Sequence, residues 1–302
     1  MNFPEFRKEI AIFIKQRMLT ALVLITVLIG VLFYLPIATF YFLMMLICLL
    51  AAWEWCQLAE FNKIYQKLMI SSLFGMILLL LAMNYWKNNI FIISTLIQFS
   101  LLLSLVWWIL AFFLIIAYPD FTVFWRHSKM LRLIFGMLTI VPFGAGILVL
   151  RQFNYEVNHY TGAIYLLYII SLVVAADSGS YLFGKLFGKH PLIPKISPGK
   201  TWEGLVGGLF SSALIYYLFS SRLTTLELPL KGLSIIILIV SIISVFASIL
   251  GDLTESMFKR EAGIKESSNL VPGHGGVLDR IDSLTAAIPI FACLLLLLGK
   301  LR

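Results

Sequence analysis

Long apolar runs without charged residues restrict this chain to a membrane-spanning fold. Nine such runs reach about 17 residues or more, which is the length that an α-helix needs to cross the hydrocarbon core of a bilayer. The predicted fold class is therefore all-α, a polytopic integral membrane protein with about nine transmembrane helices. The predicted spans are Met18–Tyr34, Ile37–Trp53, Leu68–Asn84, Ile90–Tyr118, Leu133–Leu150, Tyr160–Ala176, Gly204–Ser221, Leu233–Gly251 and Ser283–Gly299.

Composition supports the same class and excludes several others. Hydrophobic residues make up 61% of the 302 residues and charged residues only 13%, against about 45–50% and about 25% in soluble domains. A secreted, disordered or fibrous chain is excluded. Cys48, Cys56 and Cys293 lack the spacing of a zinc site or a disulfide framework. We expect one membrane-embedded domain, 1–302, with N-terminal helices in 1–160 and a catalytic part in 161–302.

The positive charge is distributed as in a membrane protein, not a nucleic-acid-binding protein. The net charge is +8, but the basic residues are scattered between apolar runs. Most of the 23 Lys and Arg residues fall on one side of the membrane if the N-terminus is cytoplasmic. The two polar segments Asp177–Glu203 and Asp252–Asp282 are then cytoplasmic too, and we expect the active site on that face.

The segment Asp252–Asp282 concentrates charge in a chain that has little of it. Asp252 directly follows an apolar run, and a carboxylate at that depth is costly unless a cation or a metal pairs with it. Asp252, Glu255 and Lys259 share one face if the helix continues past the membrane. Ordinary ion pairs at a helix end are the alternative interpretation.

A glycine-rich loop lies between these charges and a second acidic pair. Three glycines follow Pro272 within four positions, and such a backbone can approach a ligand closely. Asp279 and Asp282 are three residues apart and face the same way on a helical turn. With Asp252 they form a candidate all-oxygen site for Mg²⁺. Nearby basic residues are Lys259, Arg260 and Lys265.

The earlier polar segment carries groups that suit phosphate. Asp177 interrupts an apolar stretch at membrane depth, so it is a functional candidate, with an interhelical hydrogen bond as the alternative. Lys195, Ser197, Lys200 and Thr201 surround a glycine turn just before a predicted helix, where amides, ammonium groups and hydroxyls can meet a phosphate. A merely basic loop would explain the lysines but not the hydroxyls. Glu54, between two tryptophans, is predicted to reach the membrane interface.

These two segments resemble one known family. Ser256–Asp282 reads SMFKREAGIKESSNLVPGHGGVLDRID and is similar to the C-terminal motif of phosphatidate cytidylyltransferases, also called CDP-diacylglycerol synthases. Asp177–Gly208 reads DSGSYLFGKLFGKHPLIPKISPGKTWEGLVGG and is similar to a second segment of the bacterial members. The resemblance covers roughly residues 161–290. Glu266 departs from it, because the family usually has Asp there.

The resemblance implies that phosphatidate attacks the α-phosphorus of CTP, giving CDP-diacylglycerol and pyrophosphate in phospholipid biosynthesis. It implies metal ligation by Asp252, Asp279 and Asp282, with more than one divalent ion expected and a monovalent cation left open. The implied catalytic residues are Asp252, Lys259, Arg260, Lys265, Asp279 and Asp282. The implied substrate-binding residues are Asp177, Lys195, Ser197, Lys200, Thr201, His274, Gly275, Gly276 and Arg280.

Two other functions compete with this interpretation. A CTP-dependent lipid kinase, or a cytidylyltransferase acting on another lipid phosphate, would use similar groups; the kinase would release CDP instead of pyrophosphate. A transporter would place ionisable residues at mid-span in several helices, and this chain has almost none. The expected partners are CTP, phosphatidate and the bilayer, without nucleic acid; a homodimer stays open. The expected location is the bacterial inner membrane.

Overall fold

Eight membrane-length helices make up the computed structural model, which describes residues 25–87, 95–223, 234–268, 270 and 275–299. A shorter apolar helix, Ile25–Tyr34, precedes them; residues 18–24 of the first predicted span lie outside the described residues. The chain is a multi-pass membrane protein, as predicted. The eight helices are α2 (Ile37–Leu58), α3 (Ile64–Lys87), α4 (Thr95–Ile116), α5 (Lys129–Gln152), α6 (Thr161–Phe187), α7 (Trp202–Leu223), α8 (Ser234–Glu261) and α9 (Leu278–Leu297).

The helices differ from the apolar runs mainly at the ends that carry charge. α6 continues eleven residues past Ala176, α8 continues ten past Gly251, and α9 begins five before Ser283. A count of uncharged residues stops at the first carboxylate, whereas these helices continue because their charged groups find partners. α4, by contrast, is shorter than predicted at its C-terminal end: it ends at Ile116, and Pro119 and a short 3₁₀ helix, η1 (Asp120–Phe124), follow it.

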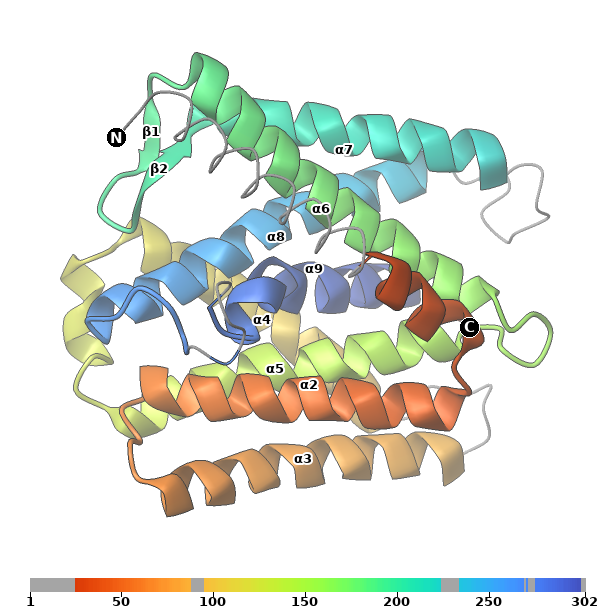
Figure 1. The fold of residues 1–302 in the computed structure, drawn as a ribbon, viewed down its shortest axis with the longest axis horizontal. Coiled ribbons are helices and arrows are strands. Elements are labelled where there is room, and N and C mark those ends of the chain that lie inside the picture. The colour runs from red at the N-terminus through yellow and green to blue at the C-terminus, as the bar shows by residue number, and fades with distance from the viewer. Residues whose placement is uncertain (1–24, 88–94, 224–233, 269, 271–274, 300–302) are drawn as a thin grey trace, which may run out of the picture.

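A small antiparallel hairpin corrects the strictly all-α prediction. β1 (Pro191–Ile193) pairs with β2 (Ser197–Thr201), which joins directly to α7. The predicted glycine turn at residues 197–201 is thus an extended strand. The residue before a proline is held away from the helical region, and Pro198, the second residue of β2, places Ser197 in that position. The hairpin stands at one end of the bundle, beside the ends of α6 and α7 (Figure 1).

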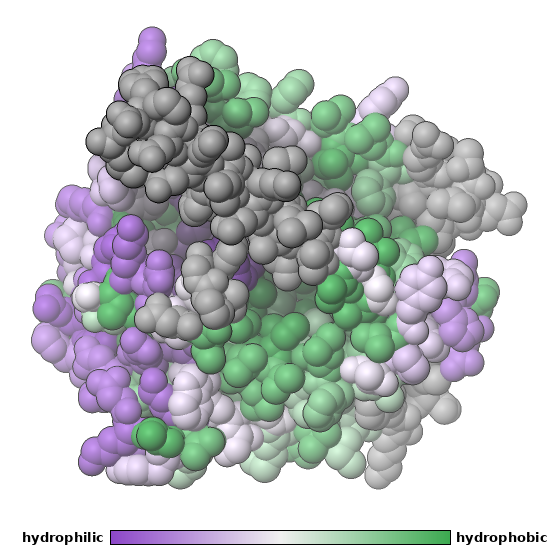
Figure 2. Space-filling model, viewed as in Figure 1, coloured by the Kyte–Doolittle hydropathy of each residue, from purple (hydrophilic) through white to green (hydrophobic). Residues whose placement is uncertain are grey.

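α5 and α9 lie inside the bundle and the other helices pack around them (Figure 1). α5 packs against α2, α3, α4, α6 and α9, while α8 packs along α9. The N-terminal helices α2 and α4 also reach α8 and α9, so one apolar core runs through both halves of the chain. A broad hydrophobic band crosses the surface, with hydrophilic residues gathered at the hairpin end (Figure 2).

Small residues let α6 and α7 approach closely. A Cβ atom placed on Gly208 of α7 would lie 2.7 Å from the carbonyl oxygen of Ala176 in α6. Gly204 has the same relation to the carbonyl oxygen of Ser180, also at 2.7 Å. Close backbone packing through small residues is a common way for helices to associate in lipid, and here it aligns Asp177 on α6 with the start of α7.

We predict that Gly208→Val destabilises the protein, because the clash is with backbone and cannot be relieved by a side-chain rotation. Overpacking of this kind costs about 1–3 kcal/mol. Gly30→Val is the matched control, since no atom lies within 4 Å of a Cβ at that helical glycine. Thermal unfolding in detergent measures the difference. Equal melting temperatures for the two variants would contradict the close packing of α6 and α7.

Candidate functional site

A cavity of about 350 Å³ brings the two polar segments together at the hairpin end of the bundle. α6 contributes Asp177, α8 contributes Asp252, and α9 contributes Asp279 and Asp282, while β2 contributes Lys200. All five were predicted as site residues. Leu192, Leu205 and Ile249 form an apolar part of the wall.

Lys200 links the hairpin to the acidic side of the cavity. Its Nζ lies 2.7 Å from Asp252 Oδ2, and both side chains are partly exposed, at 26% and 30%. Ser256, one turn along α8, donates a hydrogen bond to Asp252 Oδ1 at 3.3 Å. Because α8 continues as a helix, Asp252, Glu255 and Lys259 lie on one face, as their spacing predicts. An ammonium group is thus held where a phosphate could exchange for the carboxylate.

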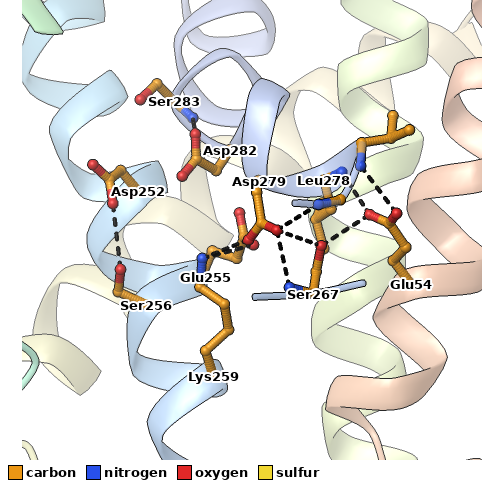
Figure 3. A network of polar contacts seen from close by, with 12 residues as sticks. Glu54, Asp252, Glu255, Ser256, Lys259, Ser267, Leu278, Asp279, Asp282 and Ser283 are labelled. Carbon is orange, nitrogen blue, oxygen red and sulfur yellow. Dashed lines mark hydrogen bonds and ion pairs between the residues drawn. The ribbon is translucent and has the colours of Figure 1, made fainter. Parts of the chain in front are cut away.

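Asp279 accepts hydrogen bonds on both carboxylate oxygens (Figure 3). Lys259 Nζ donates to Oδ1 at 2.7 Å. Oδ2 accepts from the backbone N–H of Ser267 at 2.9 Å and from the N–H of Gly276 at 2.8 Å. It also lies 3.0 Å from the Ser267 hydroxyl, whose single hydrogen it shares with Glu54. Asp279 therefore ties α8, the residue 262–277 connection and the start of α9 together at the edge of the cavity.

Glu54 is the functional-site residue that sequence reasoning missed. Its side chain is only 1% exposed, so it does not reach outward to the membrane interface as predicted. Its carboxylate accepts hydrogen bonds from the hydroxyls of Ser267 and Ser268 at 3.0 and 2.6 Å. It also accepts from the backbone N–H groups of Val277 and Leu278, at 2.9 and 2.6 Å.

This carboxylate acts as a cap for α9 supplied by another helix. The first N–H groups of a helix have no partner within it, and their positive end favours an anion. Val277, the N-cap residue of α9, has no side-chain cap of its own. The signal in the sequence was weak: an acidic residue inside an apolar run, with its partners more than 200 positions away.

The glycines next to α9 are required for close contact within this network. Gly275 has φ of +80°, and a Cβ on Gly276 would lie 2.6 Å from Glu54 Oε2. The N–H of Gly276 faces Asp279, not the cavity space. Pro272, Gly273 and His274 lie outside the described residues, so the predicted lid or phosphate contact of His274 stays a prediction.

The cavity carries more acidic than basic groups. Glu255, 3% exposed, lies behind Asp279, and its Oε1 is 3.1 Å from Lys259 Nζ; neither of its oxygens forms a hydrogen bond that satisfies ordinary geometry. One lysine and four carboxylates line the cavity, and the Lys259–Glu255 pair lies behind Asp279. In the described part of the chain, no three acidic, histidine or cysteine side chains already converge as ligands of one ion. The all-oxygen donor set and the surplus negative charge nevertheless fit a hard divalent cation.

The remaining predicted residues differ in whether they line the cavity. Thr201 lines it, and its hydroxyl accepts a hydrogen bond from the N–H of Gly204 at 3.1 Å. Arg260 donates from Nε to the carbonyl oxygen of Ile196 at 3.2 Å, so it fastens the hairpin to α8. The structure does not bring the following predicted site residues to the cavity wall: Lys195, Ser197, Lys259, Arg260, Lys265, Gly275, Gly276 and Arg280.

Comparison with known proteins agrees with the sequence motifs. The model of the cytidylyltransferase family matches residues 15–298. A phosphatidate cytidylyltransferase of Haemophilus influenzae is 42% identical over 288 residues, covering 92% of this chain and 97% of the relative. One of Pseudomonas aeruginosa is 41% identical over 286 residues, covering 93% and 97%.

A more distant relative matches mainly one part of the chain. A phosphatidate cytidylyltransferase of Staphylococcus aureus is 40% identical over 167 residues, which is 54% of this chain and 58% of the relative. Together these matches confirm the family resemblance inferred from the two motifs.

We predict that Glu54→Gln weakens the start of α9, because the amide NH₂ would face groups that are themselves donors. Buried donors left without acceptors cost about 1–3 kcal/mol each. The measurement is thermal unfolding together with amide hydrogen exchange of residues 276–282. Glu156→Gln is the control for removal of an exposed carboxylate. Unchanged exchange at α9 in Glu54→Gln would show that Glu54 does not hold this helix start.

Proposed function

The chain belongs to the cytidylyltransferase family, and we propose that it is a phosphatidate cytidylyltransferase, converting CTP and phosphatidate to CDP-diacylglycerol and pyrophosphate. The observation that carries this proposal is the convergence of both motif segments on one cavity, with Lys200 on Asp252 at 2.7 Å. The relatives that match nearly the whole chain have the same activity in their names.

The chemistry requires charge neutralisation more than proton transfer. A phosphate oxygen of phosphatidate attacks the α-phosphorus of CTP, a new P–O–P bond forms, and the bond to the β-phosphate breaks with pyrophosphate leaving. The nucleophile is already an anion, so a strong general base is unnecessary. Positioning two polyanions against their mutual repulsion is the main task, and preorganised cations do this best.

The structure suggests a division of the cavity between the two substrates. We assign Lys200 and Thr201 to the triphosphate, because the hairpin carries them on the polar side of the cavity. Leu192, Leu205 and Ile249 offer an apolar wall next to the carboxylates. Such a wall suits the glycerol and first methylenes of a lipid that enters from the bilayer. Lys259 remains near the reacting phosphates through Asp279.

Magnesium is part of the proposal. Asp252, Asp279 and Asp282 would hold it, since their carboxylates line the cavity and exceed the available lysines. When bound, a divalent ion would neutralise phosphate oxygens and stabilise the charge on the leaving pyrophosphate. Asp279 Oδ1 currently accepts from Lys259, so this residue would share its carboxylate between the lysine and the ion. The homodimer and a bound monovalent cation stay predictions.

We further propose that the cavity faces the cytoplasm in a bacterial inner membrane. The basic residues gather on the same side as the cavity by the sequence count, and CTP is available on that side. The hydrophilic end of the surface in Figure 2 is also the hairpin end.

A matched pair of lysine variants tests the substrate assignment. We predict that Lys200→Gln lowers kcat/KM for CTP by about ten- to a hundredfold, as loss of one charged hydrogen bond costs about 1.5–3 kcal/mol. Lys195→Gln, on an exposed residue of the same hairpin outside the cavity, changes kcat/KM much less. The assay follows CTP labelled at the α-phosphate into lipid. An equal loss of kcat/KM in both variants would contradict the assignment of Lys200 to the triphosphate.

The same assay separates the proposed reaction from a lipid kinase. We predict α-label in the lipid and stoichiometric pyrophosphate, both lost in Asp282→Asn. Release of labelled CDP with unlabelled lipid would establish the kinase instead.

Cysteine labelling tests the orientation. The three native cysteines are buried, so a membrane-impermeant thiol reagent reports on added ones. In intact spheroplasts we predict that Val157→Cys reacts and Lys195→Cys reacts only after permeabilisation, because these exposed residues lie at opposite ends of the bundle. The reverse pattern would place the cavity on the other face.

A further inference from the structure

A buried arginine lies at the end of the bundle opposite the catalytic cavity. Arg151 is in the last turn of α5 and is 2% exposed. It lines a separate cavity of about 510 Å³ whose other walls are the end of the first apolar helix and residues 155–160. Nothing in the proposed reaction uses this arginine, and a charge so buried requires a partner.

The protein supplies that partner only in part. Nη1 donates to the carbonyl oxygen of His159 at 3.2 Å. Nε is buried and has no hydrogen-bond acceptor among the described residues. None of the ion pairs in the described part of the chain includes Arg151. Arg132, at the other end of α5, also has a buried Nε without an acceptor, but it has a carboxylate partner, Glu60, at 2.9 Å.

Aromatic rings stabilise the guanidinium without satisfying its N–H groups. Its central carbon lies 5.5 Å from the ring centre of Phe40 and 5.2 Å from that of Tyr155. Cation–π contacts use the face of the ring system, whereas the five N–H bonds of arginine lie in the guanidinium plane. Apart from the His159 carbonyl oxygen on Nη1, the described residues supply no acceptor for Nε in that plane. A phosphate, with several oxygens that match the arginine fork, is the anion that fits best.

The depth of the site suits a lipid headgroup. Arg132 and Arg151 are separated by 19 residues of one helix, or about 28 Å at 1.5 Å per residue, close to the hydrocarbon thickness of about 30 Å. Tyr34 and Tyr160 line the cavity and are exposed, and Tyr160 packs near Phe33. Aromatic residues of this kind concentrate at the level of the headgroups.

We propose that Arg151 binds a phosphate group at the face opposite the catalytic cavity, as a structural anion site. Two sources share this chemistry: the headgroup of an anionic phospholipid in that leaflet, and inorganic phosphate from the adjacent solution. Binding completes the acceptor set of Arg151 and so stabilises the junction of α5, α6 and the first apolar helix. Ligands that bind the folded protein raise its melting temperature by mass action.

The sharpest test changes the rim of the cavity and leaves Arg151 in place. Val157 lines the cavity and is 75% exposed, so substitutions there should fold. Val157→Glu places a carboxylate where it repels an incoming anion and competes for the arginine, whereas Val157→Gln is its neutral match. Both variants keep the catalytic cavity, so phosphate binding there contributes equally to each.

The full-length protein in dodecyl maltoside is titrated with phosphatidylglycerol, with diacylglycerol of the same chains, or with inorganic phosphate, while the melting temperature is followed. We predict that phosphatidylglycerol or inorganic phosphate stabilises the wild type and Val157→Gln. In Val157→Glu the concentration for half the effect rises at least about tenfold, consistent with loss of a charge-assisted contact. Whichever of the two probes shows this difference identifies the source.

Two results would overturn the proposal: equal responses of Val157→Glu and Val157→Gln to both phosphate probes, or stabilisation by diacylglycerol equal to that by phosphatidylglycerol. Arg151→Gln, compared with Lys63→Gln at the opposite end, gives a second readout. If folded, Arg151→Gln loses the part of the response that separates Val157→Gln from Val157→Glu, and Lys63→Gln keeps it. Cytidylyl transfer in the Val157 variants stays at the wild-type rate.

Discussion

The carboxylate of Asp279 is the point on which the cavity end of this protein depends. It lies between α8 and α9, is 9% exposed, and receives an ammonium group on one oxygen and two backbone N–H groups and a shared hydroxyl on the other. Burial of an ionised group is expensive, so the surrounding donors must be held in place. Lys259 comes from a helix that continues beyond the apolar run. Ser267 comes from a connection that Glu54 holds on its other side.

The network explains how distant parts of the chain form one site. Glu54 belongs to α2, far from the polar motifs in sequence, yet it caps α9 and thereby orients Asp279 and Asp282. Arg260 holds the hairpin from the other side, which brings Lys200 to Asp252. A lipid enzyme needs its charges at one end of a bundle that is otherwise apolar. Here the cost of that arrangement is offset by pairing the charges with each other. In the proposed reaction, substrates and a divalent ion would replace some of these contacts.

Much of this architecture follows from the sequence, and the exceptions have physical causes. The lengths of the apolar runs identify the spans. The spacing of charged residues correctly places Asp252 and Lys259 on one face of α8, and Asp279 and Asp282 on one face of α9. The helix ends near residues 177, 252 and 278 were misplaced because pairing between segments, which no local pattern contains, lets charged residues continue a helix. Glu54 was misjudged for the same reason. The β1–β2 hairpin escaped prediction because two short strands have little periodicity, and its attachment to α8 through Arg260 is a tertiary contact.

A double-mutant cycle on Lys259 and Asp279 tests the central claim most directly. Lys259→Met and Asp279→Asn each leave an uncompensated buried group, whereas the double variant removes both members of the pair. Each single variant should lower the free energy of unfolding. The loss in the double variant should be smaller than the sum of the two single losses by at least about 1 kcal/mol. Losses that add within about 0.5 kcal/mol would show that the two residues do not act as a pair. The catalytic end would then have to be organised by other contacts.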